Sequence, residues 1–125
     1  RTSVLYHPRR TLGALFRQYF SYGQGRARTL LKHRNRPLAR QAVVLAVAPA
    51  ITMAALSLVS SLALIPVTVW ALACLCAGAG IAIRAREPGL LLSGFSAMVM
   101  HAAWSFGFWQ QMLSRIAGSR RRAIP

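Results

Sequence analysis

The sequence is almost without acidic residues: its 125 residues contain sixteen Lys and Arg but a single acid, Glu87. General acid–base catalysis of the usual kind needs paired titratable groups, and a metal site needs a cluster of carboxylate, His or Cys ligands. The sequence offers neither pattern, nor the Gly-rich phosphate loop of a strand–helix junction. We therefore predict that this polypeptide alone turns over no substrate and holds no metal ion.

Cysteine is also scarce. Cys74 and Cys76 are two residues apart, so on a helix they point to nearly opposite sides and lack the spacing of a metal or redox pair. We interpret both as small apolar residues inside a helix.

The longest stretch without a charged side chain, Ala42–Ile83, also lacks His, Asn and Gln. Roughly 20 apolar residues in a helix cross a hydrocarbon core of about 30 Å, and this stretch is about twice that length. It predicts two transmembrane helices in a hairpin, about 42–61 and 66–83. Pro49 lies in the first, where neighbouring groups are expected to bind the carbonyl that a proline leaves free. Small residues four apart favour close packing of the second: Ala73 with Ala77, Cys74 with Gly78 and Cys76 with Gly80.

Residues 90–109 form a third apolar segment, long enough to span, which ends in Trp and Phe residues typical of a membrane interface. The positive-inside tendency places the N-terminal segment and the Arg84/Arg86 loop in the cytoplasm. A third full span would put the basic tail, 114–125, outside, against that tendency. Either the N-terminal charges override the tail, or the third segment is re-entrant or interfacial.

Ten of the sixteen cations precede residue 41 and end where the apolar stretch begins. This placement is typical of juxtamembrane segments that face anionic lipid, so we expect an anionic bilayer as partner and no nucleic acid. Thr11 is expected to cap a helix that begins at Leu12 and continues with apolar residues at three-and-four spacing. The glycines in Tyr22–Gly25 predict a kink or break in it. An apolar face beside a basic face indicates a helix in the membrane interface, although the same face could pack on a soluble domain.

The first residues, Thr2–Tyr6, read as a short β-strand without a partner in this sequence, and the chain begins with Arg rather than Met. We expect the chain to be part of a longer protein. The predicted fold is an all-α membrane protein in which an interfacial amphipathic helix (11–41) precedes about three transmembrane helices (42–113), with an orphan strand at the N-terminus (1–10).

Two places carry candidate chemistry. Around Gly23 and Gly25, guanidinium groups could hold a diphosphate at the bilayer surface, or the segment could merely anchor the chain. His101 lies near the middle of the third apolar segment, where an ionisable group is a functional hypothesis by default. The alternative is a neutral imidazole hydrogen-bonded to Thr52 or Ser57.

The run Ser3–Lys32 resembles the junction between catalytic domain and membrane region in family 2 glycosyltransferases, in particular the succinoglycan type of bacterial exopolysaccharide synthesis. The matching residues are Tyr6, Pro8, Arg9, Arg17, Gln18, Tyr19, Phe20, Tyr22, Gly23, Gly25, Arg26 and Arg28. The Gln-x-x-Arg-Trp motif of related membrane synthases is absent from this sequence.

This resemblance implies a GT-A-type catalytic domain, ending at residues 1–10, on the cytoplasmic side of the bacterial inner membrane. That domain would use a nucleotide-sugar donor and a divalent metal, Mg or Mn, and the acceptor would be linked to a polyprenyl diphosphate. This chain would be the membrane-anchoring, acceptor-side segment, and the candidates for binding the acceptor or its diphosphate are Arg17, Gln18, Tyr22, Arg26 and Arg28. The alternative is a small self-contained basic multi-pass membrane protein without enzymatic activity, such as an anchor, a holin-like pore former or an accessory subunit.

Overall fold

The computed structural model describes residues 11–33, 36–55 and 61–122, and these ranges are helical apart from short connections. The helices are α1 (Leu12–His33), α2 (Ala39–Leu45), α3 (Val47–Ala55), α4 (Ile65–Ala85) and α5 (Leu92–Arg122), with the 3₁₀ turns η1 (Ser61–Leu64) and η2 (Pro88–Leu91) before the last two. The all-α expectation is confirmed for the described residues. The predicted strand, Thr2–Tyr6, lies outside them.

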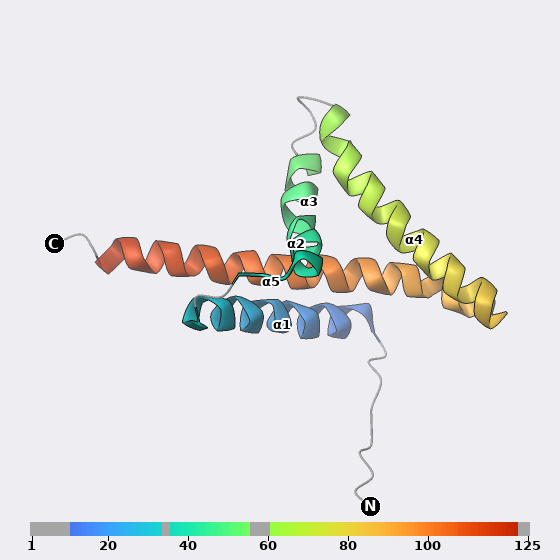
Figure 1. The fold of residues 1–125 in the computed structure, drawn as a ribbon, viewed down its shortest axis with the longest axis horizontal. Coiled ribbons are helices and arrows are strands. Elements are labelled where there is room, and N and C mark those ends of the chain that lie inside the picture. Colours follow the sequence, from blue (N-terminus) through green and yellow to red (C-terminus); the bar gives the residue numbers. More distant parts are fainter. Residues whose placement is uncertain (1–10, 34–35, 56–60, 123–125) are drawn as a thin grey trace, which may run out of the picture.

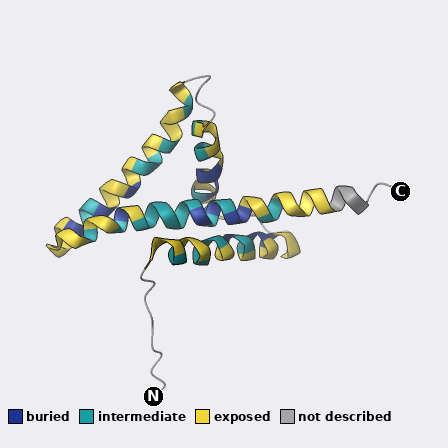
Figure 2. Cartoon of the chain, turned by 180° about the vertical axis from the view of Figure 1, so that it is seen from behind, coloured by how far each residue is buried: buried dark blue, intermediate teal, exposed yellow. Residues whose placement is uncertain are grey.

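The long helix α5 is the middle layer of the molecule. α1 lies along one side of it and runs in the same direction, while α3 and α4 rise from the other side as a hairpin (Figure 1). The side of α1 that faces α5 is its apolar side, on which Gly23, Ala27 and Leu30 are buried. The opposite side of α1 remains exposed (Figure 2).

α1 begins where the sequence predicts, because the Thr11 hydroxyl accepts a hydrogen bond from the Ala14 N–H at 3.2 Å. The predicted kink at Tyr22–Gly25 is wrong, since α1 is one unbroken helix. The reason is tertiary: a Cβ on Gly23 would overlap the Trp104 carbonyl and lie 2.9 Å from the Phe108 nitrogen of α5. This glycine lets two backbones approach closely rather than breaking a helix.

The first predicted span, 42–61, is not one continuous helix, because the described part divides at Ala46 into α2 and α3. Pro49 has no N–H to donate to the Leu45 carbonyl, one turn earlier. That carbonyl instead accepts hydrogen bonds from Ser105 Oγ at 3.0 Å and Trp109 Nε1 at 2.8 Å. Neighbouring groups thus bind the freed carbonyl, as expected. Together α2 and α3 form only a short apolar stretch, Ala39–Ala55.

α4 agrees with the second predicted span to within two residues at each end. Its packing on α5 depends on small residues: a Cβ on Gly78 would lie 2.6 Å from the Gly94 nitrogen. Cys74 is buried and Cys76 is exposed, as their opposite directions predict. The Cys74–Gly78 pair therefore faces α5 as expected, whereas a Cβ on Gly80 would meet no atom within 4 Å.

α5 continues well past the third predicted span, 90–109, and includes the first part of the predicted tail. Within the described residues, two stretches are long and apolar enough to cross a membrane, Ser61–Ala85 and Pro88–Gly118. The expectation of about three transmembrane helices is therefore not confirmed: two stretches are long enough, and the third, Ala39–Ala55, is shorter and divided.

Candidate functional site

The cationic residues of α1 lie on two different sides of the helix. Arg17 and Arg28 are eleven residues apart, about three turns, and so share one side. Arg26 is nine residues from Arg17, about two and a half turns, and therefore lies on the opposite side. The structure divides the set of guanidiniums that the sequence grouped together.

The side that carries Arg28 is joined to α5 by polar side chains. Arg28 Nε donates a hydrogen bond to Gln111 Oε1 at 3.1 Å, and Gln24 Nε2 donates to Gln110 Oε1 at 2.9 Å. These contacts help hold α1 and α5 together along their lengths. Arg28 is thus engaged within the chain through one of its nitrogens.

Gln18 and Tyr22 lie on the face of α1 that points away from α5. Gln18 Nε2 donates a hydrogen bond to the Tyr22 hydroxyl at 2.8 Å, and Tyr22 is 55% exposed. Arg17 is exposed as well. Arg17 and Tyr22 are thus exposed on this side of α1, with the half-buried Gln18 hydrogen-bonded to Tyr22.

Arg26 faces the start of α2. Its Nη2 donates a hydrogen bond to Gln41 Oε1 at 3.2 Å, and the same oxygen accepts the Leu38 N–H at 3.2 Å. The Nε of Arg26 is buried and has no hydrogen-bond partner among the described residues. The hydrogen-bonding capacity of this buried N–H is therefore unfilled among the described residues.

Next to Gln41, a cavity of about 350 Å³ opens between α1, α2 and α5. Its lining combines polar and cationic side chains with apolar ones: Tyr19, Arg40, Gln41, Val44, Met100, His101 and Trp104. Tyr19 and Arg26 are seven residues apart, about two turns, and so share this side of α1. Chemically, the cavity can receive an anionic group through Arg40 and an adjoining apolar group through Val44 and Met100.

Tyr19, Arg40 and Gln41 were not among the predicted site residues. Tyr19 belongs to the motif that carries the family resemblance, and Arg40 is the last cation before the apolar stretch. Both signals are visible in the sequence. Their meeting depends on the turn between α1 and α2, which no local pattern predicts.

His101 lines this cavity and contacts α4. Its Nδ1 accepts a hydrogen bond from Trp70 Nε1 at 3.5 Å and lies 3.8 Å from Cys74 Sγ. The predicted Thr52 partner is wrong, because the Thr52 hydroxyl donates to the Ala48 carbonyl of its own helix at 2.9 Å. Ser57, the other predicted partner, lies outside the described residues. His101 thus connects the hairpin to the wall of the cavity.

The described residues contain no group of three or more His, Cys, Asp or Glu that could hold a metal ion. Glu87, the single acid of the sequence, follows α4 and does not line the cavity.

The fold defines a membrane-associated helical unit, in which the basic helix α1 and the apolar α3–α4 hairpin lie on opposite sides of α5 and the cavity lies between α1, α2 and α5 (Figure 1). Sequence comparison finds a curated protein that is similar to this chain. The chain is 50% identical over 113 residues to the succinoglycan biosynthesis protein ExoA of Rhizobium meliloti (strain 1021). The match covers 90% of this chain and 34% of ExoA, so the chain spans about a third of that relative. The resemblance to the succinoglycan type is confirmed.

No family model matches the chain, and no solved structure matches it.

Proposed function

We propose that this chain is the membrane-anchoring, acceptor-side segment of a bacterial family 2 glycosyltransferase, which transfers a sugar from a nucleotide-sugar to a lipid-linked exopolysaccharide acceptor. The observation that carries the proposal is the 50% identity to ExoA over 113 residues. The acidic residues and the divalent metal, Mg or Mn, would belong to the two thirds of an ExoA-like protein that this chain does not match. The enzyme would lie in the inner membrane as a multi-pass protein with the basic N-terminal segment in the cytoplasm.

The cavity beside Gln41 supports an acceptor-side role. Arg40 lines it and Arg26 is hydrogen-bonded to its Gln41, so two guanidiniums are available for charge-assisted hydrogen bonds to a diphosphate. The apolar wall of Val44 and Met100 suits the first carbons of a lipid chain that leaves toward the bilayer. Of the five predicted acceptor-binding residues, we assign Arg26 to this cavity. Arg17 and Arg28, on the opposite side of α1, would contact lipid headgroups or the catalytic domain.

A chimera tests the proposal. In an ExoA-deficient strain of Rhizobium meliloti, ExoA is supplied with its matching third replaced by this chain, and the exported succinoglycan is measured. We expect production to be restored, because half of the matched residues are already identical. A chimera that reaches the membrane at the normal level without restoring any polysaccharide would contradict the proposal and favour a self-contained membrane protein.

Within a working chimera, Arg26→Lys tests the role of the cavity independently of the opposite side of α1. Lys keeps the charge but loses the two-bonded geometry of the guanidinium, and a hydrogen bond to a charged group contributes about 1.5–3 kcal/mol. We expect transfer to fall about tenfold or more, as a raised KM for the acceptor.

The matched control is Arg17→Lys, which changes the same residue type on the opposite side of α1 and is expected to alter transfer less than twofold. Membrane levels of both variants are measured alongside transfer. Equal losses in the two variants would show that the cavity is not the acceptor site. Unchanged transfer in the triple variant Arg17→Lys/Arg26→Lys/Arg28→Lys would remove the diphosphate-binding role altogether.

A further inference from the structure

We propose that α5 lies in the plane of an anionic membrane surface, although it is long and apolar enough to cross a bilayer. In this arrangement α1 packs on the side of α5 that faces water, and only the α3–α4 hairpin enters the hydrocarbon core. This inference concerns the membrane disposition of the chain and stands independently of the sugar transfer proposed above.

The first step is that α1 and α5 form one unit. Gly23 of α1 meets the backbone of α5 at Trp104, and a Cβ on Gly107 of α5 would overlap the Phe20 carbonyl of α1. The Gln24–Gln110 hydrogen bond also joins α1 to α5. Because α1 is held against α5 by backbone contacts, it must share the orientation of α5 in the membrane.

The second step is the depth of the cations. The contacts of Phe20 with Gly107 place Arg17, one turn earlier, beside the middle of the apolar part of α5. If α5 crossed the bilayer, the exposed Arg17 would face lipid near the midplane. A charged side chain at the centre of a spanning helix costs about 2.5–3.5 kcal/mol even on the most lenient scale. Glu87, the only acid, follows α4 and could compensate few of the cations of α1.

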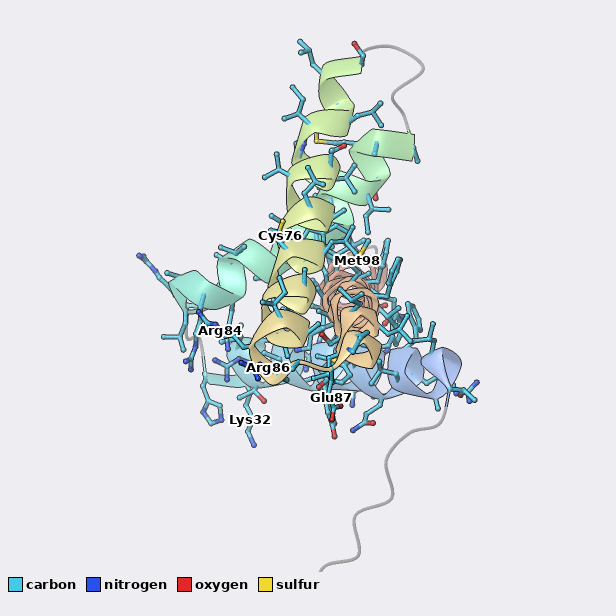
Figure 3. The ribbon with its side chains drawn as sticks, turned by 90° about the vertical axis from the view of Figure 1, so that its right-hand side faces the viewer. Lys32, Cys76, Arg84, Arg86, Glu87 and Met98 are labelled. Atoms are coloured by element: carbon cyan, nitrogen blue, oxygen red, sulfur yellow. The ribbon has the colours of Figure 1, made fainter. Side chains whose placement is uncertain are left out.

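The third step is that an in-plane α5 puts the cationic segments on one face. Arg84 and Arg86 lie close to the start of α5, and Figure 3 shows them with Lys32 on the α1 side of the molecule, while Cys76 lies further up the hairpin. Arg115 follows on α5 itself. The N-terminal segment, the loop before α5 and the tail then all lie on the same side, so the tail no longer opposes the positive-inside tendency.

The fourth step is the free face of α5. The side of α5 away from α1 carries apolar residues at helical spacing that remain exposed: Phe95, Trp109, Leu113 and Ile116. Trp109 and Leu113 lie where this side borders α3, and Trp109 also donates to the Leu45 carbonyl. An apolar stripe on an in-plane helix, beside cations and a Trp, is the pattern of an interfacial membrane helix. With a net charge of +15, the surface that fits this chain is a bilayer of anionic phospholipid.

Depth measurements on nitroxide-labelled chains test the orientation of α5. Single cysteines replace Phe95 or Leu113 in a Cys74→Ala/Cys76→Ala background, and the full chain is reconstituted in phosphatidylglycerol–phosphatidylcholine vesicles. The two positions are about 27 Å apart along α5, since a helix rises 1.5 Å per residue. If α5 lies in the plane, oxygen and a water-soluble nickel chelate report the same shallow depth for both.

Two positions on α4 provide the matched control. Val69→Cys and Ile83→Cys are both exposed on the hairpin and about 21 Å apart along the axis. We expect them to differ clearly in depth. A difference between Phe95→Cys and Leu113→Cys as large as the α4 difference would overturn the proposal. So would full exposure of both α5 labels to the nickel chelate, or spin–spin broadening at Leu113 from a second copy of the chain.

A second measurement needs no label in the apolar region. Leu12→Cys at the start of α1 and Ser114→Cys on α5 are both exposed, and a membrane-impermeant maleimide is applied to inside-out and right-side-out vesicles. We expect both cysteines to react from the same face. Reaction from opposite faces would show that α5 crosses the bilayer.

Discussion

At the scale of single residues, Ser105 connects the membrane hairpin to α5. Its side chain is fully buried, and its hydroxyl donates to the Leu45 carbonyl while accepting the Ala48 N–H at 3.0 Å. Both groups lie at the turn between α2 and α3, where Pro49 interrupts the regular pattern of hydrogen bonds. The Ser105 hydroxyl thus hydrogen-bonds two backbone groups at the bend between α2 and α3. Because the hydroxyl is buried, losing these hydrogen bonds would be energetically costly.

We predict that Ser105→Ala lowers the free energy of unfolding by about 1–3 kcal/mol, because two buried backbone groups lose a hydrogen-bond partner. Unfolding in mixed micelles, followed by Trp fluorescence, measures this change. Ser114→Ala is the control, because the Ser114 hydroxyl is exposed and donates only to the Gln110 carbonyl of its own helix. Equal losses in the two variants would contradict the role given to Ser105.

The same bend allows a double-mutant test. Pro49→Ala restores an N–H that can reach the Leu45 carbonyl, so the hydroxyl of Ser105 becomes less necessary. We predict that Ser105→Ala costs less in a Pro49→Ala background than in the natural chain, with a coupling of about 0.5–3 kcal/mol. Strictly additive effects would show that Ser105 does not compensate for the proline.

At the scale of helices, local signals predict where elements begin and end, but not how they pack. The start of α1 follows from Thr11, and the bounds of α4 follow from the length of the apolar stretch. The prediction of a kink at the glycines of α1 is wrong because helix propensity describes only the helix itself and not the helices that pack on it. Gly23 is required by the neighbouring backbone of α5, which approaches from more than eighty residues away in the sequence.

The two glycines of α1 provide a matched pair of substitutions. A Cβ at Gly23 would overlap α5, whereas a Cβ at Gly25 would meet no atom within 4 Å outside its own helix. We predict that Gly23→Ala destabilises the chain by about 1–3 kcal/mol through overpacking. Gly25→Ala should instead stabilise it by up to about 1 kcal/mol, because Ala has the higher helix propensity.

The same unfolding measurement decides this pair. An additional readout is the cross-linking yield between cysteines placed at Gln24 and Gln110, whose amides are 2.9 Å apart in the natural chain. The yield should fall with Gly23→Ala and stay constant with Gly25→Ala. Similar stabilities for both variants would mean that α1 and α5 do not meet at Gly23.

At the scale of the whole molecule, the sequence predicts which residue types could bind an acceptor, but not which of these residues the fold brings together. The sequence groups Arg26 with Arg17 and Arg28 as candidates for binding an acceptor, but in the structure Arg17 and Arg28 lie on the opposite side of α1, and only Arg26 contacts Gln41 beside the cavity. Periodicity alone separates these residues, yet it does not say which side faces a cavity. Which side faces the cavity depends on the tertiary fold, in which α2, with Arg40, and α5 pack beside the side of α1 that carries Tyr19.

The proposed role of the chain as an anchor, without catalytic groups of its own, is tested at the scale of the whole molecule. Glu87 follows α4 and does not line the cavity. The residues that line the cavity together with His101 include no carboxylate. The described lining of the cavity therefore offers no acid–base pair. We predict that the isolated chain, reconstituted with a nucleotide-sugar, Mg²⁺ and a lipid-linked acceptor, transfers no sugar, while the ExoA chimera does. Within the chimera, Glu87→Gln should change transfer less than twofold. Turnover by the isolated chain, abolished by Glu87→Gln, would place the catalytic group here and reverse this division.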